Sequence, residues 1–198
     1  MTVQEIVEQL KATFGEKVGE LSETLDPFLT LKAEDLLEIA GFLKDTAGLE
    51  MDFLQDETAV DYPDESLIRM VYHLFSYQHR HGIVLKVELD RAAPKVPTLE
   101  GLWPVANWLE REVWDLFGVD FEGHSDLRRI MLPDDWEGHP LRKDYEDPTE
   151  YHGISHDRPS PIDGFTRVDE KLRQIAAETA AQLAAATGEG ESSEESAS

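Results

Sequence analysis

The sequence has 198 residues, of which 42 are acidic and 18 basic, and its formal net charge at neutral pH is −24. A chain of this length can fold as one domain with an extension and can bury about two-thirds of the surface of its unfolded form. The absence of cysteine excludes disulfides, thiolate nucleophiles and cysteine ligands for zinc or iron–sulfur clusters. The negative charge disfavours unassisted binding to nucleic acid or an anionic membrane and favours basic protein partners.

The N-terminal residues and the hydropathy of the chain indicate where in the cell the protein is expected. Acidic residues stand near the N-terminus where a signal peptide would carry Lys or Arg, and no run of about 18 apolar residues occurs. We therefore expect a protein of the cytoplasm that depends on other chains for any attachment to a membrane.

The first part of the sequence predicts two helices and two short strands. Apolar residues recur at spacings of three and four over residues 3–14, which predicts an amphipathic helix. Two brief strands are expected at 18–21 and 28–31, because an Asp-Pro turn signal separates these apolar segments. A second helix is predicted over 32–44.

Three apolar, β-rich runs follow at 49–60, 67–77 and 83–89 and predict an antiparallel meander. The last run alternates apolar and charged residues, as in a sheet that helices cover on one face. Helical spacing returns after Pro104 and continues to Gly118. The predicted fold class is therefore α+β: a two-layer domain of order α-β-β-α-β-β-β, with helices on one face of a mixed or antiparallel sheet.

The second part of the sequence predicts little regular structure before its end. We expect the α+β domain to occupy 1–118 and a long extended loop segment that binds a partner to occupy 119–166, since so long a loop is usually functional. An Ala-rich pattern predicts a C-terminal helix over 167–187, and the acidic tail 188–198 has the composition of a disordered segment.

Histidine pairs raise the possibility of a metal site. His79 and His81 would share one face of a strand, and His152 and His156 have a spacing that would suit a helix. Neither pair belongs to an HExxH motif, and Gly153 argues against a helix at the second pair. Ordinary polar histidines are the favoured interpretation.

Neighbouring carboxylates raise the possibility of acid–base catalysis. The candidate pairs are Glu110 with Glu112 and Asp134 with Asp135. On a helix Glu110 and Glu112 would diverge by about 200°, so they could not share one substrate without help. We find no phosphate-binding loop, nucleophile elbow or dinucleotide fingerprint in the sequence.

Charged and aromatic residues alternate between positions 103 and 145. Arg111 and Asp115 are four residues apart and could pair on the surface of the predicted helix, for about 0.3–0.5 kcal/mol. Arginine and aromatic side chains on irregular backbone are the usual anchors of protein interfaces. We therefore favour a protein interface over a solvated loop. The interleaved aromatic residues are Trp103, Trp108, Trp114, Phe117, Phe121, Trp136 and Tyr145.

Three motifs in this part of the sequence resemble a known family. They are Ala106-Asn-Trp-Leu-Glu-Arg-Glu-Val-Trp-Asp-Leu-Phe-Gly118, Phe121-Glu-Gly-His-Ser-Asp-Leu-Arg-Arg-Ile130 and Glu137-Gly-His-Pro-Leu-Arg-Lys-Asp-Tyr145. In this order and spacing they resemble the 30 kDa subunit of respiratory complex I, the NADH-quinone oxidoreductase of bacteria. The sequence departs from the family pattern at Ser125 and Glu146, where Pro is usual.

The resemblance implies a cofactor-free structural subunit in the peripheral arm of a proton-translocating NADH:quinone oxidoreductase. It would pack against the subunits that carry the terminal iron–sulfur cluster and the quinone site, at the cytoplasmic face of the bacterial cell membrane. Partner subunits would bind FMN and the iron–sulfur clusters, and this chain would contribute no catalytic, cofactor-binding or metal-binding residue. The motif residues expected at the interface are Glu110, Arg111, Glu112, Asp115, Gly118, His124, Asp126, Arg128, Arg129, His139, Arg142, Lys143, Asp144 and Tyr145.

Two other functions stay open at this point. The motifs also resemble the equivalent subunit of a related membrane-bound hydrogenase or another quinone-linked complex. A stand-alone metal-dependent hydrolase that uses the His and Asp residues is the remote alternative, and it would predict bound zinc.

Overall fold

The computed structural model describes residues 1–22 and 24–155, together with the helical residues 172, 173, 175 and 179. The chain divides into two units, 1–147 and 148–198, which are considered separately. Most of the predicted C-terminal helix and all of the acidic tail lie outside the described residues, as does His156.

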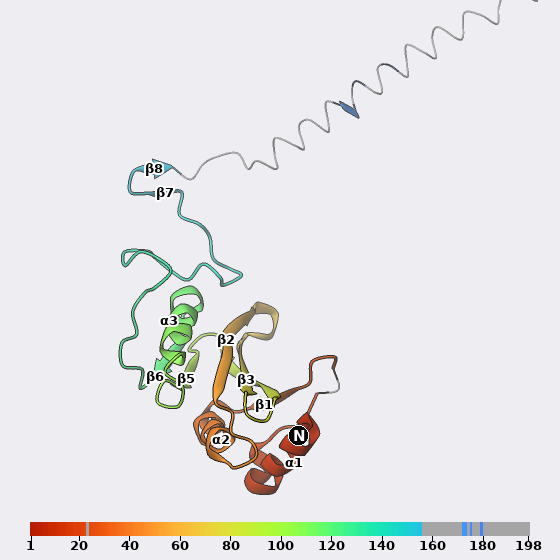
Figure 1. Ribbon diagram of the computed structural model, residues 1–198. Coiled ribbons are helices and arrows are strands. Elements are labelled where there is room, and N and C mark those ends of the chain that lie inside the picture. The colour runs from red at the N-terminus through yellow and green to blue at the C-terminus, as the bar shows by residue number, and fades with distance from the viewer. Residues whose placement is uncertain (23, 156–171, 174, 176–178, 180–198) are drawn as a thin grey trace, which may run out of the picture. The chain divides into compact units, whose positions relative to one another are not determined.

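A four-stranded mixed sheet forms the centre of the first unit (Figure 1). Its order is β1 (Phe28–Leu31), β4 (His81–Asp90), β3 (Leu67–Ser76) and β2 (Phe53–Tyr62). The strands β2, β3 and β4 form the predicted antiparallel meander, whereas β1 runs parallel to β4. The second strand expected before β1 is only a single bridge between Leu21 and Leu29.

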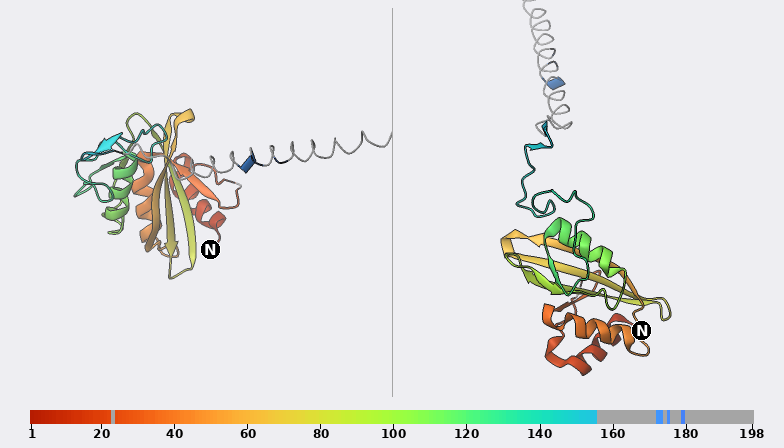
Figure 2. Two further views of the ribbon diagram at one scale, coloured as in Figure 1. Left: turned by 90° about the horizontal axis from the view of Figure 1, so that it is seen from above. Right: turned by 90° about the vertical axis from the view of Figure 1, so that its left-hand side faces the viewer.

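Three helices cover one face of this sheet, as the sequence predicted. They are α1 (Val3–Phe14), α2 (Ala33–Asp45) and α3 (Ala106–Phe117), and Figures 1 and 2 show α1 next to α2, with α3 beside β2. Alternate residues of β3 and β4 are buried against the helices, and the residues between them are only half-buried or exposed. The opposite face of the sheet is therefore open in the described part of the chain.

Short structural elements join the three helices and the sheet. Two 3-10 turns, η1 (Gly15–Lys17) and η2 (Pro63–Glu65), follow α1 and β2. A parallel ladder joins β5 (Lys95–Pro97) to β6 (Asp120–Glu122). The sequence did not predict β5 or β6, because three-residue strands are too short to show a period.

The first unit continues beyond the boundary that we predicted at Gly118. It ends at Asp147, because contacts described below tie the segment 123–147 to α3 and β2. The second unit contains a small hairpin, in which β7 (Glu150–Tyr151) pairs with β8 (Ile154–Ser155).

Gly118 ends α3 in a conformation that favours glycine. Its φ is +73°, and a Cβ atom there would lie 2.6 Å from the ring of His139. Gly41, in the middle of α2, has open space at the same position. We expect Gly118→Ala to lower the free energy of unfolding by about 1–3 kcal/mol.

Gly41→Ala is the matched control, and it should raise the free energy of unfolding by about 0.5–1 kcal/mol through higher helix propensity. Urea unfolding of both variants measures the two effects. Equal stability of the two variants would show that the contact of Gly118 with His139 is unimportant.

Candidate protein interface

The residues of α3 fall into three groups: some are buried in the core, some are exposed to solvent, and some bind other parts of the chain. Ala106, Val113 and Phe117 lie in the apolar core. Trp108 is 60% exposed, and Glu112, one turn further along on the same side of the helix, is also exposed. The remaining motif residues of α3 bind other parts of the same chain.

Asp115 is the most fully bonded of these residues. Its side chain is inaccessible to solvent, and its Oδ2 accepts hydrogen bonds from the backbone N–H groups of Ile130, Met131 and Leu132, at 2.8–3.1 Å. Its Oδ1 lies 2.5 Å from Nη1 of Arg129. Burial opposes ionisation, but the hydrogen bonds outweigh it and lower the pKa of Asp115 below the usual value.

Two arginines hold the following segment against α3. Arg129 donates from Nη2 to the carbonyl oxygen of Trp136 at 2.6 Å, in addition to its ion pair with Asp115. Arg111 donates to the carbonyl oxygens of Arg128 and Arg129, at 3.1 and 3.3 Å. Arg111 and Asp115, which could have paired on the helix surface, instead bind the segment after β6.

The C-terminal end of α3 binds the next part of the segment. Arg142 donates from Nε to the carbonyl oxygen of Phe117 at 2.6 Å, and Nδ1 of His139 donates to the carbonyl oxygen of Asp115 at 2.9 Å. These donors satisfy carbonyl groups that have no partner within a helix. Arg142 therefore stabilises this chain itself, by about 1 kcal/mol, and is not a freely exposed residue.

A third attachment joins the segment to the sheet. Arg91 binds both carboxylate oxygens of Asp61, at 2.6 and 2.9 Å, and both of Asp144, at 2.5 and 3.1 Å. The backbone N–H of Lys143 also donates to Asp61, at 2.8 Å. The hydrogen bonds from Arg91 lower the pKa of Asp61 and of Asp144.

Glu110 points into the core and not toward a partner surface. Its Oε1 accepts from the backbone N–H of Leu99 at 2.6 Å, and its Oε2 accepts from the hydroxyl of Thr98 at 2.5 Å. Nε2 of His124 lies 3.9 Å from the same carboxylate. Burial raises the pKa of Glu110 to about 7, although the two hydrogen bonds oppose this shift.

A second buried acid, Glu57, lies on the inward face of β2. It is 3% exposed, and neither of its carboxyl oxygens has a hydrogen-bond partner among the described residues. Burial raises the pKa of Glu57 well above its usual value, and the charge of Glu110 adds to this effect. Burial without a hydrogen-bond partner among the described residues therefore favours the protonated form of Glu57.

The structure separates the predicted interface residues into two groups. Those that are buried or half-buried within the chain are Glu110, Arg111, Asp115, Gly118, His124, Arg129, His139, Arg142 and Tyr145. Those that are exposed are Glu112, Asp126, Arg128, Lys143 and Asp144. Four large apolar side chains of the same region are also exposed, namely Val105, Trp108, Met131 and Leu141. Only the exposed residues are available to a partner without rearrangement.

The other candidate residues of the sequence make local contacts. Nε2 of His79 lies 2.5 Å from Glu50, and Nε2 of His81 donates to the carbonyl oxygen of Leu49 at 2.9 Å. Glu110 and Glu112 lie on different sides of α3, one buried and one exposed. The described residues contain no group of three or more His, Asp or Glu side chains arranged to hold a metal ion.

Comparison with known proteins identifies the family of this chain. Residues 29–151 match the family described as "Respiratory-chain NADH dehydrogenase, 30 Kd subunit". The chain belongs to this family. Two relatives are named as subunits of NADH-quinone oxidoreductase. The relative from Moorella thermoacetica is 52% identical over 132 residues, which are 66% of this chain and 88% of the relative. The relative from Roseiflexus sp. is 43% identical over 141 residues, 70% and 81% of the two chains.

Solved structures share the fold of this 30 kDa family member. A chain of the membrane-bound sulfane sulfur reductase, an archaeal respiratory membrane complex, matches 72% of this chain and 85% of its own length, with a TM-score of 0.61 and 28% identity. A trypsin-resistant fragment of Nqo5 matches over its whole length and over 64% of this chain, with a TM-score of 0.53 and 30% identity. No helix in the described part of the chain has both the length and the apolar character needed to span a bilayer.

Three buried or segment-binding residues of this family member were not predicted from the sequence: Glu57, Asp61 and Arg91. A signal for the two acids was present, because Glu57, Ala59 and Asp61 alternate along β2 and Ala59 is a core residue. An acid at an inward position of a strand needs a specific partner, or it keeps its proton. Nothing local in the sequence indicates Arg91 as the partner of Asp61.

Loss of the Asp115 carboxylate should release the segment after β6. We expect Asp115→Ala to lower the free energy of unfolding by about 3–5 kcal/mol, because it leaves Arg129 and three backbone N–H groups without their acceptor. Asp126→Ala is the control: the Asp126 side chain is 55% exposed and, among the described residues, pairs with Arg128 alone, so its loss should cost under about 0.5 kcal/mol. Urea unfolding and proteolysis between 128 and 138 measure the effect, and similar results for both variants would contradict it.

Glu57 should make the stability of the family member fall at alkaline pH. The pKa of Glu57 in the folded chain lies above the usual value of 4.5. Its contribution to the free energy of unfolding is therefore fully present below pH 4.5 and is lost as the pH rises through the folded pKa. Glu57→Gln cannot ionise. Its free energy of unfolding should match the wild type within about 0.5 kcal/mol at pH 5 and exceed it by about 1–3 kcal/mol at pH 9. Urea unfolding at both pH values tests this, with the exposed Glu112→Gln as control, and a difference that does not change with pH would refute it.

Proposed function

We propose that this chain is a cofactor-free structural subunit of a proton-translocating NADH-quinone oxidoreductase, respiratory complex I. The match of residues 29–151 to the 30 kDa subunit family is the observation that carries the proposal. Two relatives named as subunits of NADH-quinone oxidoreductase, at 52% and 43% identity, support it. The chain would contribute to the oxidoreductase without performing a catalytic step itself.

The surface that would contact partners is formed by α3 and the segment 123–147. Val105, Trp108 and Glu112 lie on one side of α3, and Met131 and Leu141 are exposed on the segment. Exposed aromatic and apolar side chains beside charged ones are the usual composition of a protein interface. The internal bonds of Asp115, Arg129 and Arg142 would hold this irregular surface in one conformation before it binds, which reduces the entropy lost on assembly.

Partners would supply the redox chemistry of the assembly. The chain has no cysteine, and it would pack against the subunits that carry the terminal iron–sulfur cluster and the quinone site. FMN and the iron–sulfur clusters would belong to those and other subunits of the peripheral arm. The site of assembly would be the cytoplasmic face of the bacterial cell membrane, to which the partners would attach it.

A second candidate function is the same structural role in another respiratory complex. The similarity to a chain of the membrane-bound sulfane sulfur reductase, with a TM-score of 0.61, favours this candidate. Co-purification distinguishes the two, because the identity of the partner subunits defines the complex.

The proposal predicts that folding and assembly respond differently to loss of Trp108. Trp108→Ala should change the free energy of unfolding by under about 0.5 kcal/mol but should weaken binding to partner subunits by about tenfold or more. Thermal unfolding of the isolated chain and co-purification with the subunits of the complex measure the two effects. Leu37→Ala is the control, because Leu37 is 47% exposed but lies on α2.

The same preparation tests the absence of a cofactor. The isolated chain should be colourless when purified under anaerobic conditions. Stoichiometric flavin or iron–sulfur absorption would contradict the structural role, and equal co-purification of Trp108→Ala and Leu37→Ala would show that α3 does not contact a partner.

A further inference from the structure

A hollow lies at the β1-side edge of the sheet, where Val3 of α1 lines it together with His73, Phe75 and Val84 of the open face. β1 begins at Phe28, opposite Val84 of β4, whereas β3 pairs with β4 as far as His81. The first residues of β4 therefore have a strand on one side only in the described chain, and the loop that carries Asp26 and Pro27 stands on the other side. The hollow has a volume of about 180 Å³.

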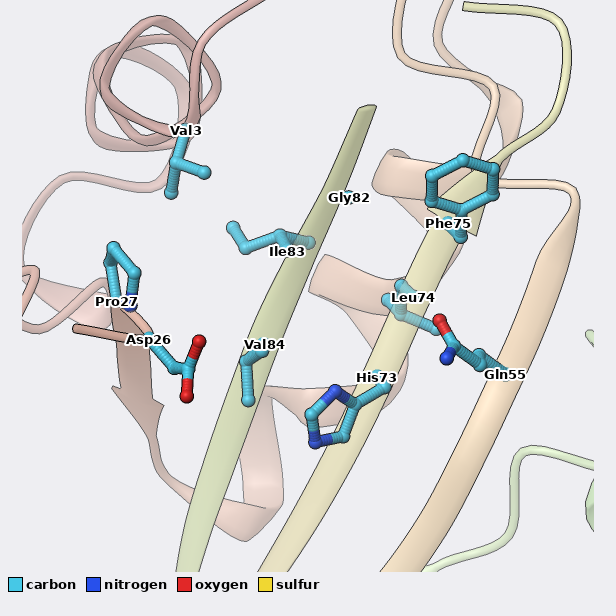
Figure 3. Close-up of a pocket in the computed structure, with 10 residues that line it drawn as sticks. All are labelled: Val3, Asp26, Pro27, Gln55, His73, Leu74, Phe75, Gly82, Ile83 and Val84. Atoms are coloured by element: carbon cyan, nitrogen blue, oxygen red, sulfur yellow. The ribbon is translucent and has the colours of Figure 1, made fainter. Parts of the chain in front are cut away.

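Apolar groups form the walls of this hollow. Pro27, Val84 and Phe75 line it, and the ring of Phe75 lies close over Gly82, where a Cβ atom would be 3.3 Å from a ring carbon. Figure 3 shows Val84 between the carboxylate of Asp26 and the imidazole of His73. An apolar floor with a carboxylate at one edge suits a ligand that is apolar along its length and charged at its tip.

The polar groups of the hollow are not used by the fold. Asp26, His73 and Gln55 line it, and among the described residues their side chains have no hydrogen-bond or ion-pair partner. Lys86, the next residue on this face of β4, lies over the ring of Phe28 with its Nζ 3.5 Å from the centroid. The carboxylate of Asp26 is therefore available to an external cation.

Size and charge together indicate the occupant. Small-molecule sites usually have volumes of about 300–1,000 Å³, so a hollow of about 180 Å³ suits one side chain better than a metabolite. The net charge of −24 attracts basic partners and repels a second copy of this chain.

We propose that this hollow is a second contact site for a neighbouring subunit and that it receives a protruding Lys or Arg side chain. The alkyl part lies against Pro27, Val84 and Phe75, and the cationic group binds Asp26. The assignment rests on the proposed function for the identity of the partner as a subunit of the same complex. The site lies at the edge of the sheet beside β1 and is accessible from the face that the helices leave open; Val3 of α1 also lines it.

Substitutions within the hollow test the contact in the assembled complex. Asp26→Asn removes the charge, and Val84→Phe fills the space from the open face without altering the core. Each should lower the recovery of partner subunits with the tagged chain by about tenfold. The controls make the same changes outside the hollow: Asp64→Asn in the turn η2, and Val71→Phe on the same face of β3.

A cross-link identifies the occupant. Because the chain has no cysteine, Leu25→Cys creates a single attachment point for benzophenone maleimide beside Asp26, at a residue that is 97% exposed. Mass spectrometry of the complex should find the adduct on a peptide of another subunit that contains Lys or Arg. Leu37→Cys, on α2, should not give that adduct.

Several results would overturn the assignment. They are full recovery of partners with both Asp26→Asn and Val84→Phe, an equal loss with the controls, and an adduct on a second copy of this chain. In each case the unaltered chain would still co-purify with its complex, and the proposed function would stand. An unaltered chain that co-purified with no other subunit would contradict the proposed function and the assigned partner together.

Discussion

The buried carboxylate of Asp115 is the interaction on which the second half of the first unit depends. A carboxylate without access to water is costly unless charged and polar donors surround it. Here one oxygen accepts from three consecutive backbone N–H groups, and the other pairs with Arg129. All four donors come from residues 129–132, so the charge of Asp115 determines where this irregular segment lies against α3.

The same bonds explain how a chain with little regular structure between 123 and 147 belongs to the first unit. Three charged centres replace a hydrophobic core there: Asp115 with Arg129, Arg142 at the end of α3, and Arg91 between Asp61 and Asp144. Because these charges are satisfied within the chain, the exposed residues beside them are free to bind a partner. The region therefore stabilises the first unit, and under the proposed function its exposed residues would contact a partner.

Buried acids of this protein differ according to the donors that reach them. Asp115 accepts several charged and backbone hydrogen bonds, and its pKa is lowered. Glu57 accepts none among the described residues, and its pKa is raised by burial and by the neighbouring Glu110. Comparable burial therefore favours the ionised form of Asp115 and the protonated form of Glu57. The hydrogen bonds of Asp115 hold the segment after β6, and the raised pKa of Glu57 is the basis of the predicted loss of stability at alkaline pH.

The sequence by itself determined the elements whose signals are local. Periodicity predicted α1, α2, α3 and the meander, because burial of one side of a helix or strand repeats at a fixed interval. The motifs from Ala106 to Tyr145 also determined the family. Only the tertiary structure decided which of their charges face inward. Asp115 meets donors 14 to 17 residues away, and Asp61 meets the backbone of Lys143 at a separation of 82 residues. No periodic signal reports such contacts, because their partners come together only after the strands and helices have packed.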